Sequence, residues 1–261
     1  MLLAVDVGNT RISIGVYSED SLVHTWRVST GRDKTEDEYG MVLLSLLEGS
    51  GVEVAEINGA VIACVVPPVT PVLEKTISKY LGLDPLVVGP GVKTGINIKY
   101  ENPKEVGPDR IAHAVAAVKK YGPPLIIIDF GTATTFDAIS AKGEYLGGVI
   151  APGIQTALEA LFEKAARLPR IELSRPRRAI GKTSAESMQS GMIYGFAGMV
   201  DGLVRRLSRE MGSQPFVVAT GDSADMVARE TESIKAVEPF LALEGLRLIY
   251  EMNANPGPGD S

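Results

Sequence analysis

Two short segments each place an aspartate, a glycine and threonine hydroxyls directly after an apolar run. The chain begins MLLAVDVGNT, with Asp6 after the apolar residues, and Leu125–Thr135 reads LIIIDFGTATT, with Asp129 in the same position. Glycine lets backbone N–H groups approach phosphate oxygens, threonine adds donors, and an adjacent aspartate suits Mg²⁺ or a larger monovalent cation. Either segment alone is equally well explained as a core strand ending in an ordinary turn. Their repetition, close to half the chain apart, favours a two-sided phosphate clamp of the kind used in phosphoryl transfer.

A third polar group, Gly107-Pro108-Asp109-Arg110, stands where a helix is expected to begin. Proline suits the first turn of a helix, and the helix macrodipole favours an acid there, which is enough to explain Asp109 taken by itself. The functional alternative is a general base for a substrate hydroxyl, beside an arginine that can bind a carboxylate with two N–H groups.

The elements that must position these residues occur twice in the same order. A buried strand, a turn with an acid and two antiparallel strands are followed by alternating helices and strands. The segment 90–108, rich in Gly, Pro and Asn, indicates a functional loop. The expected strands are 2–6, 11–17, 22–29, 60–66, 86–88, 125–130, 134–140, 144–150, 216–220 and 234–237, and the expected helices are 35–47, 69–81, 111–121, 153–166, 184–211, one from Ser223, and 241–252.

Composition excludes several classes of protein. The 261 residues are 45% hydrophobic and carry a net charge of −6, with no dense basic cluster beyond 175–178, so nucleic acid or an anionic membrane is not expected as a partner. No stretch of about 18 apolar residues predicts a membrane span, and no signal peptide precedes the first strand. The single cysteine, Cys64, lies in an apolar run and is interpreted as a buried core thiol in a cytoplasmic protein.

The helix expected over 184–211 carries glycines at positions i, i+4, i+7 and i+11, which lie on one helix face: Gly191, Gly195, Gly198 and Gly202. Each glycine inside a helix costs about 1 kcal/mol relative to alanine, so four in register require an explanation. Close approach of another backbone explains them, either within the domain or across a dimer axis.

Five segments together resemble type III pantothenate kinase, a family of the actin, sugar-kinase and heat-shock-chaperone superfamily, over nearly the whole chain. They are DVGNT (6–10), YENPKEVGPDR (100–110), DFGTATT (129–135), GGVIAPG (147–153) and LEGLRLIYE (243–251). The resemblance implies an α/β fold of two duplicated ribonuclease-H-like (actin-like ATPase) domains around a central cleft. We expect an N-terminal domain over 1–117, a C-terminal domain over 118–252 and a disordered tail over 253–261.

The same resemblance implies ATP-dependent phosphorylation of pantothenate, the first step of coenzyme A synthesis, by a cytoplasmic homodimer that uses Mg²⁺ and K⁺ or NH₄⁺. It makes Asp109 the proton acceptor and Asp129 the ligand of the monovalent cation. It assigns to ATP the residues Asp6, Val7, Gly8, Asn9, Thr10, Arg11, Ile12, Ser13 and Thr132, and to pantothenate Tyr100, Gly107, Pro108, Asp109, Arg110 and Ser184.

Two positions depart from the family pattern. Ser184 replaces the usual threonine, which keeps a hydroxyl and loses a methyl group. Asp222 replaces the second of two adjacent glycines near the adenosine, which leaves another phosphate donor open. The remaining alternatives are a kinase for another small hydroxy acid, because the clamp does not identify the acceptor, and a non-catalytic nucleotide-binding scaffold. The Asp109–Arg110 pair speaks against a scaffold, which has no need of an acid beside an anion-binding arginine.

Overall fold

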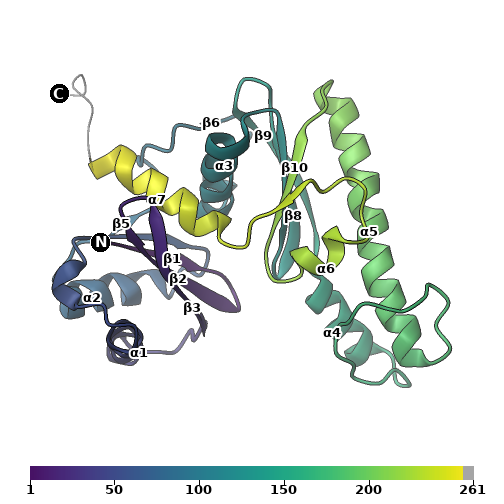
Figure 1. The fold of residues 1–261 in the computed structure, drawn as a ribbon, viewed down its shortest axis with the longest axis horizontal. Helices are drawn as coiled ribbons and strands as arrows, with labels where there is room; N and C mark the ends of the chain where they lie inside the picture. The colour runs from purple at the N-terminus through teal and green to yellow at the C-terminus, as the bar shows by residue number, and fades with distance from the viewer. Residues whose placement is uncertain (255–261) are drawn as a thin grey trace. The chain divides into compact units, whose positions relative to one another are not determined.

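The computed structural model describes residues 1–254, which divide into two compact units (Figure 1). Unit 1 comprises 1–96, 102–116 and the chain from Leu241, and unit 2 comprises 97–101 and 117–240. Each unit contains one sheet, and the sheets have the same strand plan. The prediction of duplicated ribonuclease-H-like α/β domains is therefore confirmed.

Unit 1 is built on a five-stranded sheet with the order β3-β2-β1-β4-β5. The first three strands form an antiparallel meander, whereas β4 pairs parallel to β1 and β5 pairs parallel to β4. The strands are β1 (Leu2–Val7), β2 (Arg11–Ser18), β3 (Ser21–Ser29), β4 (Gly59–Cys64) and β5 (Leu86–Val87), and the helices are α1 (Glu36–Gly49), α2 (Thr70–Leu81), most of α3 (Pro108–Tyr121) and α7 (Leu241–Ala254), with short 3₁₀ turns at Val54–Glu56 and Pro103–Glu105.

Unit 2 repeats this plan as β9-β8-β7-β10-β11 and adds β6 beside β9. Again the first three strands are antiparallel, and β10 and β11 continue parallel to β7. The strands are β6 (Asn97–Ile98), β7 (Leu125–Phe130), β8 (Ala133–Ile139), β9 (Glu144–Pro152), β10 (Phe216–Thr220) and β11 (Ala236–Val237), and the helices are α4 (Ile154–Lys164), α5 (Ser184–Met211) and α6 (Ala224–Ala228).

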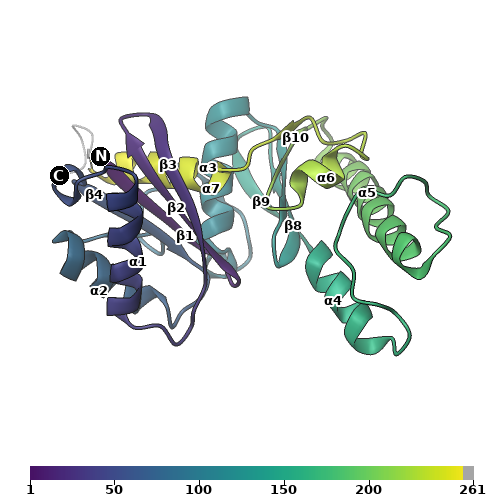
Figure 2. The same cartoon turned by 60° about the horizontal axis from the view of Figure 1, so that its bottom comes forward.

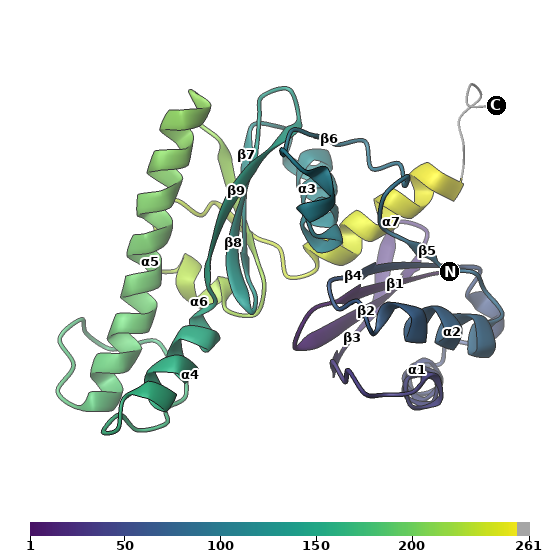
Figure 3. The same ribbon diagram turned by 180° about the vertical axis from the view of Figure 1, so that it is seen from behind.

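Helices cover both faces of the unit 1 sheet (Figures 2 and 3). One face packs on α1 and α2 through a cluster that includes Leu3, Leu43 and Ile77. The other packs on α3 and α7 through a second cluster that includes Ala4 and Leu246. Strands buried on both faces carry continuous apolar runs, which is why β1 and β4 contain almost no polar residues.

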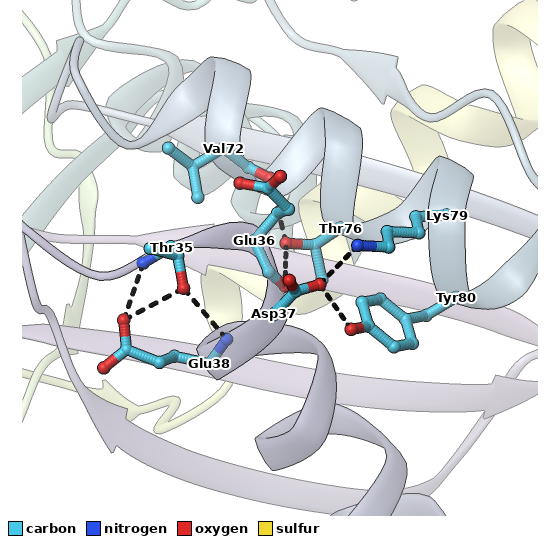
Figure 4. Close-up of polar contacts among 8 residues, drawn as sticks. All are labelled: Thr35, Glu36, Asp37, Glu38, Val72, Thr76, Lys79 and Tyr80. Atoms are coloured by element: carbon cyan, nitrogen blue, oxygen red, sulfur yellow. Dashed lines mark hydrogen bonds and ion pairs between the residues drawn. The ribbon is translucent and has the colours of Figure 1, made fainter.

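Helices α1 and α2 are joined by polar contacts at the start of α1 (Figure 4). Thr35 and Glu38 form a capping box that satisfies free N–H groups of the first turn. Asp37 accepts hydrogen bonds from Lys79 and Tyr80 of α2, and the Lys79 bond is the main reason that the pKa of Asp37 is lowered. The buried Thr76 hydroxyl donates to the carbonyls of Val72 and Glu36. The amphipathic pair is therefore fixed in register on its sheet.

Helix α7 reaches its position because Gly245 lies directly against the backbone of α3. A Cβ atom at Gly245 would overlap the Ala112 carbonyl, so only glycine permits the two helices to approach this closely. Two residues further on, Arg247 is only 6% exposed and is bonded to the carboxylates of Asp20, Glu244 and Glu251. A buried guanidinium is tolerated because three carboxylates compensate for its lost hydration.

One face of the unit 2 sheet packs against α4, α5 and α6 in a third apolar cluster that includes Ile128, Phe136 and Ile193. The residues of α5 that face the sheet are Ile193, Ala197, Val200 and Val204. Within residues 1–254, no helix combines the length and the apolar character that crossing a membrane requires.

Several expectations from the sequence need correction. Helix α7, assigned to the C-terminal domain, belongs to unit 1, and the segment 97–101 belongs to unit 2, because each packs on the sheet of the other half of the chain. The predicted tail begins too early, since Asn253 and Ala254 complete α7, and the rest of it lies outside the described residues. The loop expected over 90–108 contains the short strand β6.

The glycine face of α5 does not pack closely within its own unit. A Cβ atom at Gly191, Gly195, Gly198 or Gly202 would meet no atom within 4 Å. Packing within the domain, one of the two alternatives, is therefore wrong for these four glycines.

The α3–α7 contact predicts a large effect of a single methyl group. Gly245→Ala should lower the free energy of unfolding by about 1–3 kcal/mol, the usual cost of overpacking, because the Ala112 backbone cannot move aside as a flexible side chain would. Urea denaturation measures the change.

Gly49→Ala is the matched control, because a Cβ at this helical glycine meets no atom within 4 Å. It should be neutral or stabilising by up to about 1 kcal/mol. Equal stability of the two variants would contradict the proposed close contact.

Candidate active site

The first of the two predicted phosphate-binding turns, Gly8-Asn9-Thr10, joins β1 to β2. Its geometry is fixed by the Gly8 amide, which donates to the Arg11 carbonyl at 2.9 Å, and by the Thr30 hydroxyl at the end of β3, which donates to the Gly8 carbonyl at 2.8 Å. A Cβ at Gly8 would lie 3.1 Å from the Arg11 carbonyl, which is tighter than ordinary packing. The turn is thus held on both sides while its side chains at Asn9 and Thr10 remain exposed.

The predicted ATP-binding residues around this turn differ in what they can offer. Val7 and Ile12, paired across β1 and β2, are 0% and 1% exposed, so their side chains cannot contact a ligand. Asp6 and Ser13 are partly exposed and pair with each other in the next register position, and Arg11 is exposed. The Asp6 carboxylate and the Ser13 hydroxyl, at the ends of β1 and β2 that the turn joins, therefore lie close to the turn.

The second turn, after β7, is packed against backbone from two other segments. Gly153, the last residue of the GGVIAPG segment, lies so close that a Cβ atom would overlap the carbonyls of Gly131 and Thr132. The Gly153 amide and the Thr156 hydroxyl both donate to the Thr132 carbonyl, at 3.1 and 2.8 Å. The start of α4 thereby fixes this turn and leaves Thr132 exposed.

The Asp129 carboxylate lies between two glycines. A Cβ at Gly221 would be 2.6 Å from its Oδ1 atom, and one at Gly131 would be 3.2 Å from its Oδ2 atom. Gly221 also has a φ of +93°, a conformation that other residues rarely adopt. The oxygen atoms nearest to such a Cβ at Gly221 are Asp129 Oδ1, at 2.6 Å, and the Phe130 carbonyl, at 2.7 Å, so a carboxylate and a carbonyl, the kinds of ligand that hard cations prefer, lie close together here.

Asp129 pairs with Thr135 as Asp6 pairs with Ser13, so the two acids occupy equivalent positions in the two units. Residues 1–254 contain no cluster of three or more His, Cys, Asp or Glu side chains suited to a metal. A magnesium ion that entered with a nucleotide would therefore depend on phosphate and water oxygens together with an acid such as Asp6.

Asp109 lies in the first turn of α3, which begins at Pro108, as the Gly107–Arg110 group predicts, three residues before the stretch 111–121 that was expected to be helical. Its Oδ1 atom accepts a hydrogen bond from the Arg110 amide at 2.8 Å, and the carboxylate occupies the space that a side chain at position 107 would need. Gly107 is thus required by the acid that follows it. Arg110 is 8% exposed. The helix-start interpretation of Asp109 is compatible with a functional one, because this contact engages only one carboxylate oxygen.

Tyr100 and Ser184 both belong to unit 2. Tyr100 follows the edge strand β6 and is partly buried against β9. Ser184 is the exposed first residue of α5, in an open hollow of about 630 Å³ between α4 and α5, and no other predicted site residue lines this hollow. Its neighbours there include Lys182 and Gly191 of the glycine face.

The sequence reasoning missed the positioning role of three glycines, namely Gly147, Gly153 and Gly221. Their signal was present in the GGVIAPG and TGD segments, but a glycine that contacts distant backbone looks the same in sequence as one in an ordinary turn.

Comparison with known proteins agrees with this geometry. The family model described as type III pantothenate kinase matches residues 2–206. The type III pantothenate kinase of Moorella thermoacetica is 55% identical over 97% of this chain and 100% of its own length, and that of Halalkalibacterium halodurans is 50% identical with the same coverage.

Solved structures with low sequence identity show the same fold. A Campylobacter jejuni protein provisionally assigned to the Baf family of transcriptional activators matches with a TM-score of 0.63 and 17% identity, over 97% of this chain and 99% of its own. A Sinorhizobium meliloti protein provisionally assigned as 2-dehydro-3-deoxygalactonokinase matches with a TM-score of 0.62 and 11% identity, over 100% and 98%. The identities and coverage in sequence show that this chain belongs to the type III pantothenate kinase family.

Proposed function

We propose that this protein transfers the γ-phosphoryl group of ATP to pantothenate, forming 4'-phosphopantothenate and ADP in the first step of coenzyme A synthesis. The observation that carries the proposal is the 55% identity, over nearly the full length of both chains, to a type III pantothenate kinase. The duplicated phosphate turns support it, because phosphoryl transfer depends mainly on positioning and charge neutralisation. We place the protein in the cytoplasm, where it would bind ATP and pantothenate.

The two turns bind the phosphates of ATP in this proposal. Exposed side chains at Asn9, Thr10 and Thr132 donate to phosphate oxygens, as do the backbone amides of Asn9 and Thr10 in the turn. Asp6 would hold Mg²⁺ through water or directly, and Asp129 would hold K⁺ or NH₄⁺ together with the nearby Phe130 carbonyl. The bound cations neutralise phosphate charge. Asp222, exposed beside Gly221, keeps a donor other than ATP as the alternative to be tested with a panel of nucleotides.

Asp109 is the proton acceptor. Its Oδ1 atom is engaged by the Arg110 amide, so we assign the role to Oδ2. The primary hydroxyl of pantothenate gives its proton to Oδ2 as its oxygen bonds to the γ-phosphorus, and the bond from that phosphorus to the ADP oxygen breaks. Arg110 and the Gly107–Pro108 backbone bind the pantothenate carboxylate and orient the hydroxyl, and Tyr100 and Ser184 complete the substrate contacts.

A homodimer accounts for the glycine face of α5. The four glycines cost about 1 kcal/mol each relative to alanine, and a Cβ atom at any of them would meet no atom of another element of residues 1–254 within 4 Å. A second copy of α5 would use the space that their missing side chains leave. Gly191 lines the same hollow as Ser184, so we infer that the partner's helix lies beside this substrate residue.

Replacing the proposed base tests the mechanism. Asp109→Asn should reduce kcat for pantothenate by at least about 100-fold, because an amide cannot accept the proton. Coupled measurement of ADP release gives kcat, and thermal unfolding shows whether the variant is folded.

Glu36→Gln is the control, since Glu36 is also an acid in the first helical turn of its helix, α1. It should retain wild-type turnover. If Asp109→Asn also retained turnover and lost only stability, Asp109 would be a helix-start acid and the assignment of the base would be wrong.

The proposed cation site predicts a dependence on K⁺. Asp129→Asn should weaken half-maximal activation by K⁺ at least about tenfold, because binding of hard cations depends on the number of charged ligands. Activity is measured against KCl at constant ionic strength. Asp225→Asn, an exposed acid on α6, should behave as the wild type, and identical K⁺ curves for Asp129→Asn would count against the site.

The glycine face predicts the oligomeric state. Light scattering should give a mass of twice the 27.7 kDa of the chain, and Gly195→Leu should shift it toward one chain by filling the interface. Gly49→Leu, a substitution in an equally open place on α1, should leave the mass unchanged. A wild-type protein that remained a monomer at all concentrations would refute the dimer.

A further inference from the structure

The ring of Tyr100 packs on residues of unit 2. Tyr100 lies two residues after β6, whose residues Asn97 and Ile98 pair with Glu144 and Tyr145 of β9. The Lys99 amide donates to the Tyr145 carbonyl at 2.8 Å, which continues this pairing up to the residue before Tyr100. The backbone of β9 therefore sets where the Tyr100 side chain begins.

Tyr145 supplies the surface against which the Tyr100 ring packs. The two rings meet edge to face, with centroids 6.4 Å apart and planes at 63°. This is the arrangement that the charge distribution of aromatic rings favours. Tyr145 is 0% exposed, whereas Tyr100 is partly exposed, so Tyr145 is the fixed member of the pair and Tyr100 is the member that a ligand can reach.

The Tyr145 ring is itself fixed by a buried carboxylate. Its hydroxyl donates to Oδ1 of Asp137 at 2.6 Å, and Asp137 is 0% exposed on the neighbouring strand β8. A hydrogen bond to a buried ionisable group is short and directional, and it restricts rotation of the donor. The carboxylate therefore defines one orientation of the ring.

Gly147 completes the support of Tyr100. A β-bulge shifts the β8–β9 register, so that Ala138 faces Gly147 and Ile139 faces Tyr145, with Leu146 as the extra residue. Gly147 has a φ of +130°, and a Cβ there would lie 3.3 Å from the Tyr100 ring. The Tyr100 ring thus packs on two surfaces: the backbone of Gly147, which has no side chain, and the ring of Tyr145.

We propose that Tyr145 is a positioning residue for pantothenate binding: it holds the Tyr100 ring in place and is oriented in turn by Asp137. This rests on the proposed function, in which Tyr100 contacts the substrate. Tyr145 touches no substrate itself. An aromatic pair that only stabilised the edge of the sheet would contribute to folding and leave substrate affinity unchanged, so the two roles are separable by kinetics.

The experiment is a double-mutant cycle on the full-length protein with Tyr100→Leu, Tyr145→Leu and the combined variant. The KM for pantothenate, the KM for ATP and kcat are measured for each. Tyr145→Leu should raise the KM for pantothenate about three- to tenfold, the effect of losing one aromatic contact, while the KM for ATP stays within about twofold because the cycle alters only pantothenate contacts.

The combined variant separates the two roles. If Tyr145 acts through Tyr100, the KM for pantothenate in the double variant equals that of Tyr100→Leu alone. If the KM increases of the two single variants multiplied in the double variant, the inference would be overturned. It would also be overturned if Tyr145→Leu left the KM for pantothenate unchanged while Tyr100→Leu raised it. If Tyr100→Leu itself left the KM unchanged, the proposed substrate role of Tyr100 would be wrong and the inference would fall with it.

Phe136→Leu is the matched control, because Phe136 is a fully buried aromatic residue of the same sheet that packs toward α5. It should lower stability and leave the KM for pantothenate unchanged.

If Tyr145→Leu does not fold, Tyr145→Phe replaces it in the cycle. This variant keeps the ring, frees it from Asp137 and should raise the KM about two- to threefold, since part of the aromatic contact remains; an unchanged KM would overturn the inference.

Discussion

Close backbone contact at glycine is the constraint on which the turn after β7 depends. Gly153 lies against the Gly131–Thr132 carbonyls, and Gly221 lies against the Asp129 carboxylate, each at a distance that no Cβ atom tolerates. The ends of β9 and β10 are therefore held against a single turn. The Asp129 side chain is positioned by this packing, so a cation beside it would find its ligands already arranged and would lose little free energy to reorganisation.

In unit 1, close contact at a glycine holds α7, a helix from the C-terminal end of the described chain. Gly245 brings α7 against α3, and the buried Arg247 with its three carboxylates fixes α7 to the β2–β3 turn at Asp20. Burial, and then the Glu244 carboxylate, raise the pKa of the neighbouring Tyr17 hydroxyl, which therefore stays neutral. The helix that begins with Pro108 and Asp109 is thus packed against α7 at Ala112, through Gly245, which has no part in the proposed chemistry.

The segment around Tyr100 shows how the substrate residues are divided between the units. The chain leaves unit 1 after Ile96, adds β6 to the unit 2 sheet and returns to unit 1 at Asn102. Tyr100 is consequently fixed to β9, whereas Asp109 is fixed to α3. Each group of proposed substrate contacts thus belongs to its own unit, and the eight residues 101–108 join Tyr100 to Asp109 along the chain.

The amino-acid sequence by itself determined the element order, the duplicated strand–turn design and the acids at Asp6, Asp109 and Asp129, because apolar periodicity and turn chemistry are local properties. It also predicted α5 with the bounds that the structure has, Ser184–Met211. Only the tertiary structure decided that α7 belongs to unit 1, that β6 pairs with β9, and that α5 turns its glycines away from its own unit. These features depend on contacts between residues far apart in the chain, and a pattern read along one segment contains no information about which distant backbone will occupy the space that its glycines leave open.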